Sequence, residues 1–134
     1  MLQSTHPLTL AYALTDSPVG QLAWIAEKFT EWSDPACSIS GDRVLTNVML
    51  YRLTRTASSS ARIYRDSPAG PLPCPPPVGV AVFAHDITLP VRPIAERTYT
   101  ITHWSEFHRG GHFPALEMPD LFIDDVRAFF RDLC

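Results

Sequence analysis

Apolar residues recur at helical spacing in the first half of the chain, and the first such segment has a clear start. Asp16 or Ser17 can accept hydrogen bonds from the amides of a helix N-terminus, and Pro18 fits the first turn, where its missing donor does no harm. The apolar stripe that follows consists of Leu22, Ile25, Ala26, Phe29 and Trp32. This spacing predicts a helix that ends near Trp32 and buries most of the stripe.

Two more helices are predicted before residue 67. Ser40 is placed to cap a helix that begins near Asp42, and the apolar residues of that helix lie around much of its circumference. These residues are Val44, Leu45, Val48, Met49, Tyr51 and Leu53. Residues 57–66 favour a third, shorter helix with Tyr64 near its end. Three consecutive helices followed by strands indicate a helical layer or cap that leads into a sheet.

The second half of the chain changes to strand patterns after a proline-rich segment. Residues 67–77 contain six prolines, which favours an irregular, semi-rigid connector. Residues 78–83 form a continuous apolar run, typical of a strand that is buried on both faces of a parallel sheet. Residues 98–104 alternate between polar and β-branched or aromatic residues, as a strand with two different faces does. A short helical segment at 92–97 makes a β-α-β crossover between them plausible.

A closing helix is predicted from Pro119 onwards, and its apolar face is expected to lie against the sheet. That face consists of Phe122, Val126, Phe129, Phe130 and Leu133. The expected fold class is therefore α/β, with a helical segment at 1–67, a proline-rich connector at 68–77 and a sheet-containing part at 78–134.

Composition narrows the range of partners. The net charge is -3 and no basic run is present, so nucleic acid is not an expected partner. Three widely spaced cysteines, Cys37, Cys74 and Cys134, are expected to be free structural thiols in a reducing compartment. The N-terminal residues do not resemble a secretory signal, and the longest apolar run is too short to span a bilayer. A cytoplasmic location without a membrane span is the expectation.

The chemistry that the sequence favours centres on His112. Gly110-Gly111 allows the chain to leave the sheet sharply, so His112 is expected on a loop just beyond a strand. Asp86 is expected just beyond the preceding strand, and catalytic groups gather at the carboxyl ends of parallel strands. An imidazole that is steadied by a carboxylate is suited to general-base catalysis. The plainer interpretations are a loop histidine bonded to backbone and an aspartate that serves the turn.

Other kinds of site have weaker support. His103, His108 and His112 could suggest zinc, but their spacing fits neither a helical metal-binding motif nor a zinc finger. No two glycines have the spacing of a phosphate-binding loop. Neither a cofactor nor a metal is expected.

Five segments of the chain carry a further signal: 16–25 (DSPVGQLAWI), 27–29 (EKF), 45–51 (LTNVMLY), 59–64 (SSARIY) and 109–113 (RGGHF). In this order they resemble the C-terminal part of epoxide hydrolases of the microsomal and fungal type, which are members of the α/β-hydrolase superfamily. The resemblance implies a partial α/β-hydrolase fold: the second half of a helical cap, then the last two parallel strands and the closing helix.

The resemblance also implies roles for three residues. His112 matches the base that activates water against an ester intermediate, and Asp86 matches the acid that orients this histidine. Tyr64 matches one of two cap tyrosines that hydrogen-bond the epoxide oxygen and help to protonate the leaving alkoxide. Without the resemblance, Tyr64 would be interpreted as a half-buried packing residue. The nucleophilic aspartate and the oxyanion segment lie upstream in the family, and this chain contains neither a His-Gly pair nor a Gly-x-Asp-x-Gly elbow.

The expected function is therefore that of a C-terminal piece of an epoxide hydrolase, an enzyme class associated with detoxification, which converts a small-molecule epoxide into a vicinal diol. Without a nucleophile the isolated chain is expected to be inactive. One alternative is a non-catalytic interaction module that self-associates or binds a separate N-terminal half through an unpaired strand edge and an apolar face. Another is ester or haloalkane hydrolysis on the same scaffold.

Overall fold

The computed structural model describes residues 2–67, 70, 72, 74–131 and 133, and these residues form two compact units. One unit contains Met1–Glu31 and Ile39–Gly70, and the other contains Trp32–Ser38 and Pro71–Cys134. The segment Trp32–Ser38 thus packs with the sheet-containing part, although the sequence pattern groups it with the helical segment 1–67. None of the helices in the described residues has the length and apolar character needed to cross a bilayer.

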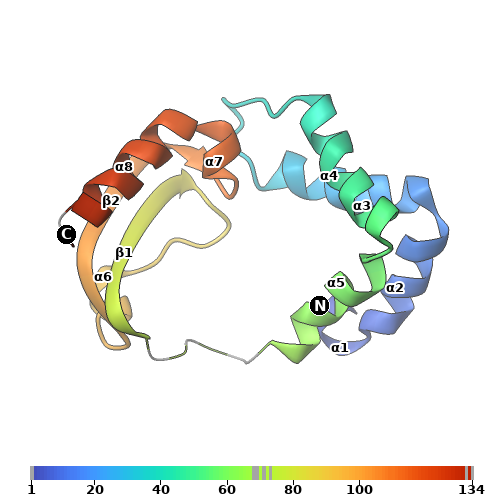
Figure 1. Ribbon diagram of the computed structural model, residues 1–134, viewed down its shortest axis with the longest axis horizontal. Helices are drawn as coiled ribbons and strands as arrows, with labels where there is room; N and C mark the ends of the chain where they lie inside the picture. The colour runs from blue at the N-terminus through green and yellow to red at the C-terminus, as the bar shows by residue number, and fades with distance from the viewer. Residues whose placement is uncertain (1, 68–69, 71, 73, 132, 134) are drawn as a thin grey trace. The chain divides into compact units, whose positions relative to one another are not determined.

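The helical unit contains five helices within its described residues (Figure 1). They are α1 (Leu2–Thr5), α2 (Pro7–Asp16), α3 (Pro18–Glu31), α4 (Gly41–Thr54) and α5 (Ala57–Asp66). The predicted caps are confirmed, because the side-chain oxygen of Ser17 accepts from the amide of Gly20 at 3.0 Å and that of Ser40 accepts from Arg43 at 3.4 Å. The sequence did not predict α1 and α2; Pro7 lies in the first turn of α2, the one place where a helix tolerates it.

The second unit is built on two parallel strands, β1 (Cys74–His85) and β2 (Tyr99–Gly111), which lie side by side in Figure 1. The parallel pairing that the sequence predicts is confirmed. The strand β1 begins earlier than expected, because Cys74 already pairs with Tyr99, ahead of an irregularity in register before Val78. Residues 74–77 are therefore strand and not connector, a correction consistent with the tolerance of prolines at the first residues and irregular positions of a strand. Of the predicted connector, 68, 69, 71 and 73 lie outside the described residues.

Three helices complete this unit: α6 (Arg92–Ala95), α7 (Pro114–Glu117) and α8 (Pro119–Arg131). The ring of Phe129 on α8 lies so close to Gly79 that a Cβ at this glycine would be 2.8 Å from it. The closing helix thus packs on β1 as predicted. Phe130, however, is 56% exposed, so its predicted position against the sheet is wrong.

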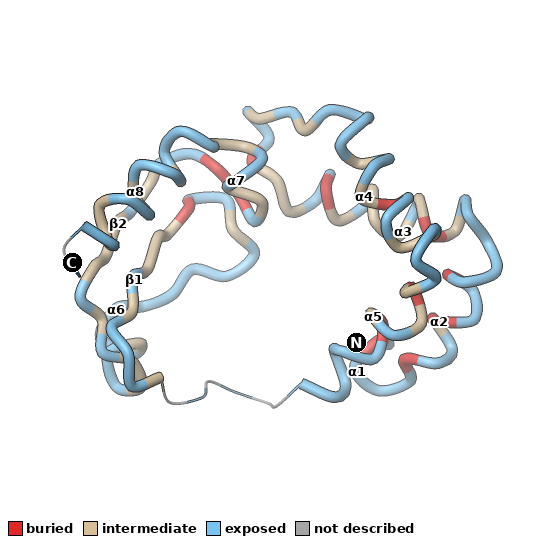
Figure 2. The backbone as a smooth tube through the Cα atoms, in the orientation of Figure 1, coloured by how far each residue is buried: buried red, intermediate tan, exposed pale blue. Residues whose placement is uncertain are grey.

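Burial in this unit is concentrated at the carboxyl ends of the strands. Among its described residues the buried ones are Asp34, Phe83, Gly110 and Gly111 (Figure 2). The prediction that β1 is buried on both faces is wrong, because β2 is its one strand neighbour among the described residues and most of its side chains are half-buried or exposed. The tightest packing of the unit therefore surrounds the loops that follow the strands.

Candidate functional site

The two residues that the sequence singles out at the strand ends lie in direct contact. Nδ1 of His112 is 2.8 Å from Oδ1 of Asp86, and the same carboxylate oxygen accepts the amide of Ile87 at 2.7 Å. The side chain of His112 is 37% exposed and that of Asp86 is 32% exposed. The pair is therefore formed within the fold and remains accessible to solvent.

This geometry fixes the tautomer of the neutral imidazole. An ionised carboxylate can only accept hydrogen bonds, so Nδ1 of His112 must carry the proton that it shares with Asp86. Nε2 is then the basic nitrogen, and no described residue forms a hydrogen bond with it. A histidine held in this way can take a proton from a water molecule while the carboxylate stabilises the resulting imidazolium.

The parallel strands and two glycines bring His112 to Asp86. Because β1 and β2 run in the same direction, Asp86 and His112 follow the same edge of the sheet. Gly110 has a φ of 87°, a conformation that a residue with a Cβ rarely adopts. At Gly111 a Cβ would lie 2.5 Å from the carbonyl oxygen of Trp32, so only glycine allows this close approach. The turn at the end of β2 therefore needs both glycines.

Sequence reasoning missed the importance of the segment that approaches this turn. The carbonyl oxygen of Trp32 accepts the amide of His112 at 2.8 Å, and its indole packs edge-on against the imidazole with ring centroids 5.2 Å apart. The helical spacing assigned Trp32 to the apolar stripe of α3, whereas it lies beyond that helix and is half-buried beside His112. Only the fold could show this, because the two residues are 80 positions apart.

Asp34 is a buried anchor in the same segment. Its side chain is 3% exposed and accepts the amides of Gly110 and Ala36, both at 2.8 Å. The amides of Ala36 and Gly110 hold the pKa of Asp34 below its ordinary value, against the opposing effect of burial. Nε2 of His85, the last residue of β1, lies 3.7 Å from the carboxylate of Asp34. Cys37 and Cys74 are free thiols, and Cys134 lies outside the described residues.

Tyr64, the third residue singled out from the sequence, lies in the helical unit. It occupies the last turn of α5 and is 49% exposed. The strand-end pair belongs to the other unit, so the structure brings together two of the three predicted site residues, and the third belongs to a different unit.

A second histidine–carboxylate pair lies between β2 and α8. Nε2 of His103 is 2.8 Å from Oδ1 of Asp125, and the hydroxyl of Ser105 donates to the same carboxylate oxygen and lies 3.1 Å from Nε2. The exposed fractions of the side chains are 18% for His103 and 11% for Asp125. Within the described part of the chain, no three histidine, cysteine, aspartate or glutamate side chains are arranged to hold a metal ion.

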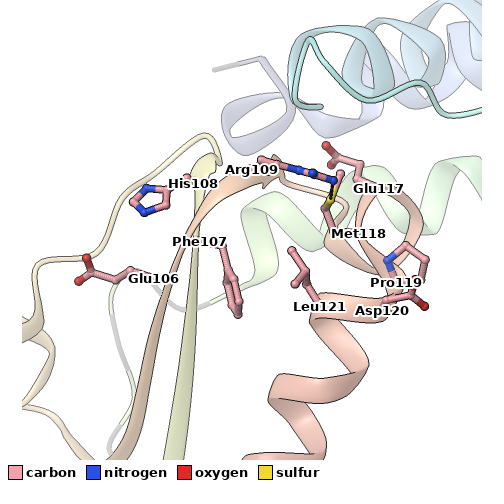
Figure 3. A pocket seen from close by; sticks show the side chains of 9 residues that line it. All are labelled: Glu106, Phe107, His108, Arg109, Glu117, Met118, Pro119, Asp120 and Leu121. Carbon is pink, nitrogen blue, oxygen red and sulfur yellow. Dashed lines mark hydrogen bonds between the residues drawn. The ribbon is translucent and has the colours of Figure 1, made fainter.

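Described residues of this unit line two cavities. One, of about 350 Å³, is lined by Asp86 and His112, by His103 and Asp125, and by apolar residues of β1 and α8. The other, of about 550 Å³, is larger but contains neither Asp86 nor His112 (Figure 3). It is lined by Glu106 to Arg109 of β2 and by residues 117–121, and there Arg109 donates to the sulfur of Met118 at 3.1 Å. The smaller cavity is the one that adjoins the base.

Comparison with known proteins identifies the relatives of this chain. A scan against protein-family models gave no match. The chain is 46% identical to a protein of Stigmatella aurantiaca named "Putative epoxide hydrolase", over 99% of this chain and 32% of that protein. It is 33% identical to epoxide hydrolase 1 of Sus scrofa, over 96% of this chain and 32% of that protein.

Solved structures agree with the sequence relatives. The structure of Aspergillus niger epoxide hydrolase matches 100% of this chain and 35% of its own length, with a TM-score of 0.89 and 31% identity. The predicted partial α/β-hydrolase fold is confirmed by this match. The chain is therefore homologous to part of proteins named epoxide hydrolases and shares part of their α/β-hydrolase fold, and it spans about a third of the length of the relatives that it matches.

Proposed function

We propose that this chain supplies the general base, its orienting acid and a proton-donating phenol to the hydrolysis of an epoxide. The observation that carries the proposal is the bond between Nδ1 of His112 and Asp86, because it leaves Nε2 as the basic nitrogen on an accessible imidazole. The relatives, which are named epoxide hydrolases, supply the class of substrate.

The proposed reaction has two steps. A carboxylate nucleophile from a part of the fold that this chain does not contain attacks an epoxide carbon, the C–O bond opens, and Tyr64 donates its phenolic proton to the leaving alkoxide. In the second step Nε2 of His112 removes a proton from water, and the resulting hydroxide attacks the carbonyl carbon of the ester. The ester C–O bond then breaks, the diol leaves, and the nucleophile is restored as a carboxylate. The proton taken up by His112 returns through solvent to the phenolate of Tyr64.

A chimera tests this proposal. The chain replaces the corresponding third of the Aspergillus niger enzyme, and the formation of diol from styrene oxide is measured for the chimera and for the isolated chain. We expect the chimera to form diol and the isolated chain to form none, because the isolated chain lacks the nucleophile. A folded chimera that forms no diol would refute the proposal, and diol from the isolated chain would show that the nucleophile lies within it.

Tyr64 separates epoxide opening from ester or haloalkane hydrolysis, because neither of these needs a phenol for a leaving alkoxide. In the chimera, Tyr64→Phe is expected to slow epoxide opening by roughly 10²-fold, the scale of one lost proton donor. The exposed Tyr12 on α2 provides the control, because Tyr12→Phe removes the same hydroxyl from a residue without a proposed role. Equal rates for the Tyr64 variant and the control would favour a different hydrolytic reaction.

Association with the rest of an α/β-hydrolase core is the second part of the proposal. Apolar side chains of α8 are exposed, among them Leu121, Ile123 and Phe130, and the small residues Gly79 and Ala81 of β1 line an open cavity. Such an apolar surface favours a protein partner. Co-expression with the remaining two thirds of the fungal enzyme as a separate chain is expected to give a complex on size-exclusion chromatography, whereas separate elution of the two would refute association.

A further inference from the structure

Four consecutive backbone amides around His112 are each held by a distant part of the unit or by a side chain. The amide of Gly110 donates to Asp34 at 2.8 Å, that of Gly111 to Glu117 at 2.9 Å, that of His112 to the carbonyl oxygen of Trp32 at 2.8 Å, and that of Phe113 to Glu117 at 2.9 Å. Loops at strand ends ordinarily satisfy such groups with water or local turns. This loop is therefore fixed along its whole backbone.

Glu117 makes the central contribution to this arrangement. Its Oε2 accepts the amides of Gly111 and Asp34, at 2.9 and 2.7 Å, and its Oε1 accepts the amide of Phe113. One carboxylate thus binds the residue before His112, the residue after it, and the segment that carries Trp32. Hydrogen bonds from amides to an ionised carboxylate are stronger than those between neutral groups.

The orientation of the imidazole depends on this backbone support because side-chain packing alone does not fix the ring. With a third or more of His112 exposed, neighbouring side chains do not enclose the ring, and its bond to Asp86 competes with water. Fixing the backbone on both sides of His112 fixes the direction of its Cα–Cβ bond, and the edge contact with Trp32 then limits rotation of the ring. A small displacement of a catalytic base from its reactive position lowers the rate of proton transfer.

We infer that Glu117 is a positioning residue for His112, one that acts through the amides of Gly111 and Phe113 and not on the reacting atoms. The inference rests on the proposed function only in that it takes His112 to be the base. Glu117 lines the cavity of Figure 3, whereas His112 lines the other cavity, in agreement with an indirect role.

The two oxygens of Glu117 have different tasks, which gives a specific substitution test. In Glu117→Gln the single remaining oxygen can keep the amides of Gly111 and Asp34, but an NH₂ group then faces the amide of Phe113 and cannot accept from it. In Glu117→Ala all three amides lose their acceptor. Glu106→Gln is a matched control, because Glu106 lines the same cavity and accepts a hydrogen bond from the indole of Trp104 but from no backbone amide of the described residues.

Amide hydrogen exchange of the ¹⁵N-labelled 134-residue chain, followed by NMR, measures these effects directly. In Glu117→Gln we expect amide exchange at Phe113 to accelerate about tenfold or more, with smaller changes at Gly111 and Asp34. In Glu117→Ala we expect exchange at all three amides to accelerate to that extent. Glu106→Gln is expected to leave all three unchanged. In both Glu117 variants the ¹⁵N signals of the His112 imidazole are expected to shift away from a single Nδ1–H tautomer.

Two results would overturn the inference. One is faster exchange at Phe113 with an unchanged His112 imidazole, which would make Glu117 a local anchor without influence on the base. The other is a uniform acceleration throughout the β1–β2 ladder in Glu117→Gln, which would make it a residue of general stability. Neither readout requires epoxide turnover, so failure of the chimera to form diol would refute the proposed function and leave this test intact.

Discussion

Among the described residues of the sheet-containing unit, two histidine–carboxylate hydrogen bonds have the same 2.8 Å length and different surroundings. His112 meets Asp86 through Nδ1 and is 37% exposed, whereas His103 meets Asp125 through Nε2, shares that nitrogen with Ser105, and is 18% exposed. A short histidine–carboxylate contact therefore does not by itself indicate a base. What matters is which nitrogen faces the acid and whether the other can reach water and substrate.

The second pair has a different task. Asp125 lies on α8 while His103 and Ser105 lie on β2, so their hydrogen bonds join the closing helix to the sheet. Serine, histidine and aspartate are all present, but the serine and the aspartate meet the same imidazole nitrogen. In a catalytic triad they occupy opposite nitrogens. The cluster therefore joins α8 to β2 and is not arranged as a hydrolytic site.

The largest difference between the pairs is expected in turnover. In the chimera, His112→Ala is expected to lower the rate of diol formation by roughly 10³-fold or more, because the ester intermediate loses the base that hydrolyses it. The intermediate should then accumulate and be visible by intact-protein mass spectrometry. His103→Ala is expected to retain turnover in any chimera that remains folded, and an equal loss in both variants would contradict the distinction.

The two pairs can also be compared by replacing the carboxylate of each with an amide. Asp86→Asn is expected to lower turnover by about 10²–10⁴-fold, since an amide no longer selects the Nδ1–H tautomer or stabilises an imidazolium. Asp125→Asn has the same chemistry in the other pair and is expected to leave the rate within a few-fold of the original. Steady-state kinetics of the two chimeras measures the contrast, and a rate in Asp86→Asn equal to that of the parent would contradict the role of Asp86.

The effects on stability are expected to have the opposite order: the loss of His103 lowers the free energy of unfolding more than the loss of His112. His103→Ala leaves the half-buried carboxylate of Asp125 without its imidazole partner and is expected to lower the free energy of unfolding by about 1–3 kcal/mol. His112→Ala removes a more exposed ring and is expected to cost less. Urea unfolding of both variants, monitored by circular dichroism, tests this, and a larger loss for His112→Ala would mean that the exposed pair is the structural one.

The smallest expected effect is a loss of local stability at low pH. The amides of Ala36 and Gly110 lower the pKa of Asp34 in the folded chain, so its contribution to stability is complete above the ordinary carboxyl value. The contribution is lost as pH falls through the lowered value. Acid is therefore expected to loosen the turn at Gly110, seen as a change in the fluorescence of the neighbouring Trp32, and Asp34→Asn is expected to abolish that pH dependence. An unchanged acid transition in Asp34→Asn would show that another group controls it.

Several helices and both strands could be predicted from local pattern. Ser17, Ser40 and Pro119 marked helix starts because capping and proline effects act within a few residues. Asp86 and His112 could be placed at one edge because parallel strands end together. The family resemblance supplied the suggested role of Tyr64, which no periodicity contains.

The anchors of the base could not be predicted in the same way. Asp34 and Glu117 act on amides that are far away in sequence or spread over several positions, and neither lies in a motif that marks it as an acceptor. One local signal did exist: Glu117 follows Pro114 in the first turn of α7 and reaches back to the amide of Phe113, as an acid near a helix start often does. Likewise, the sequence places His103 within a strand and His112 beyond one, but the pairing of His103 with Asp125 depends on how α8 packs and has no local signal.

The tautomer of His112 tests the account most directly. In ¹⁵N-resolved NMR of the chain at neutral pH, His112 is expected to carry its proton on Nδ1, with Nε2 unprotonated, while His103 shows the opposite tautomer with its proton on Nε2. If the neutral form of His112 instead carried its proton on Nε2, the nitrogen assigned to water activation would not be a base, and the proposed role of the Asp86–His112 pair would be wrong.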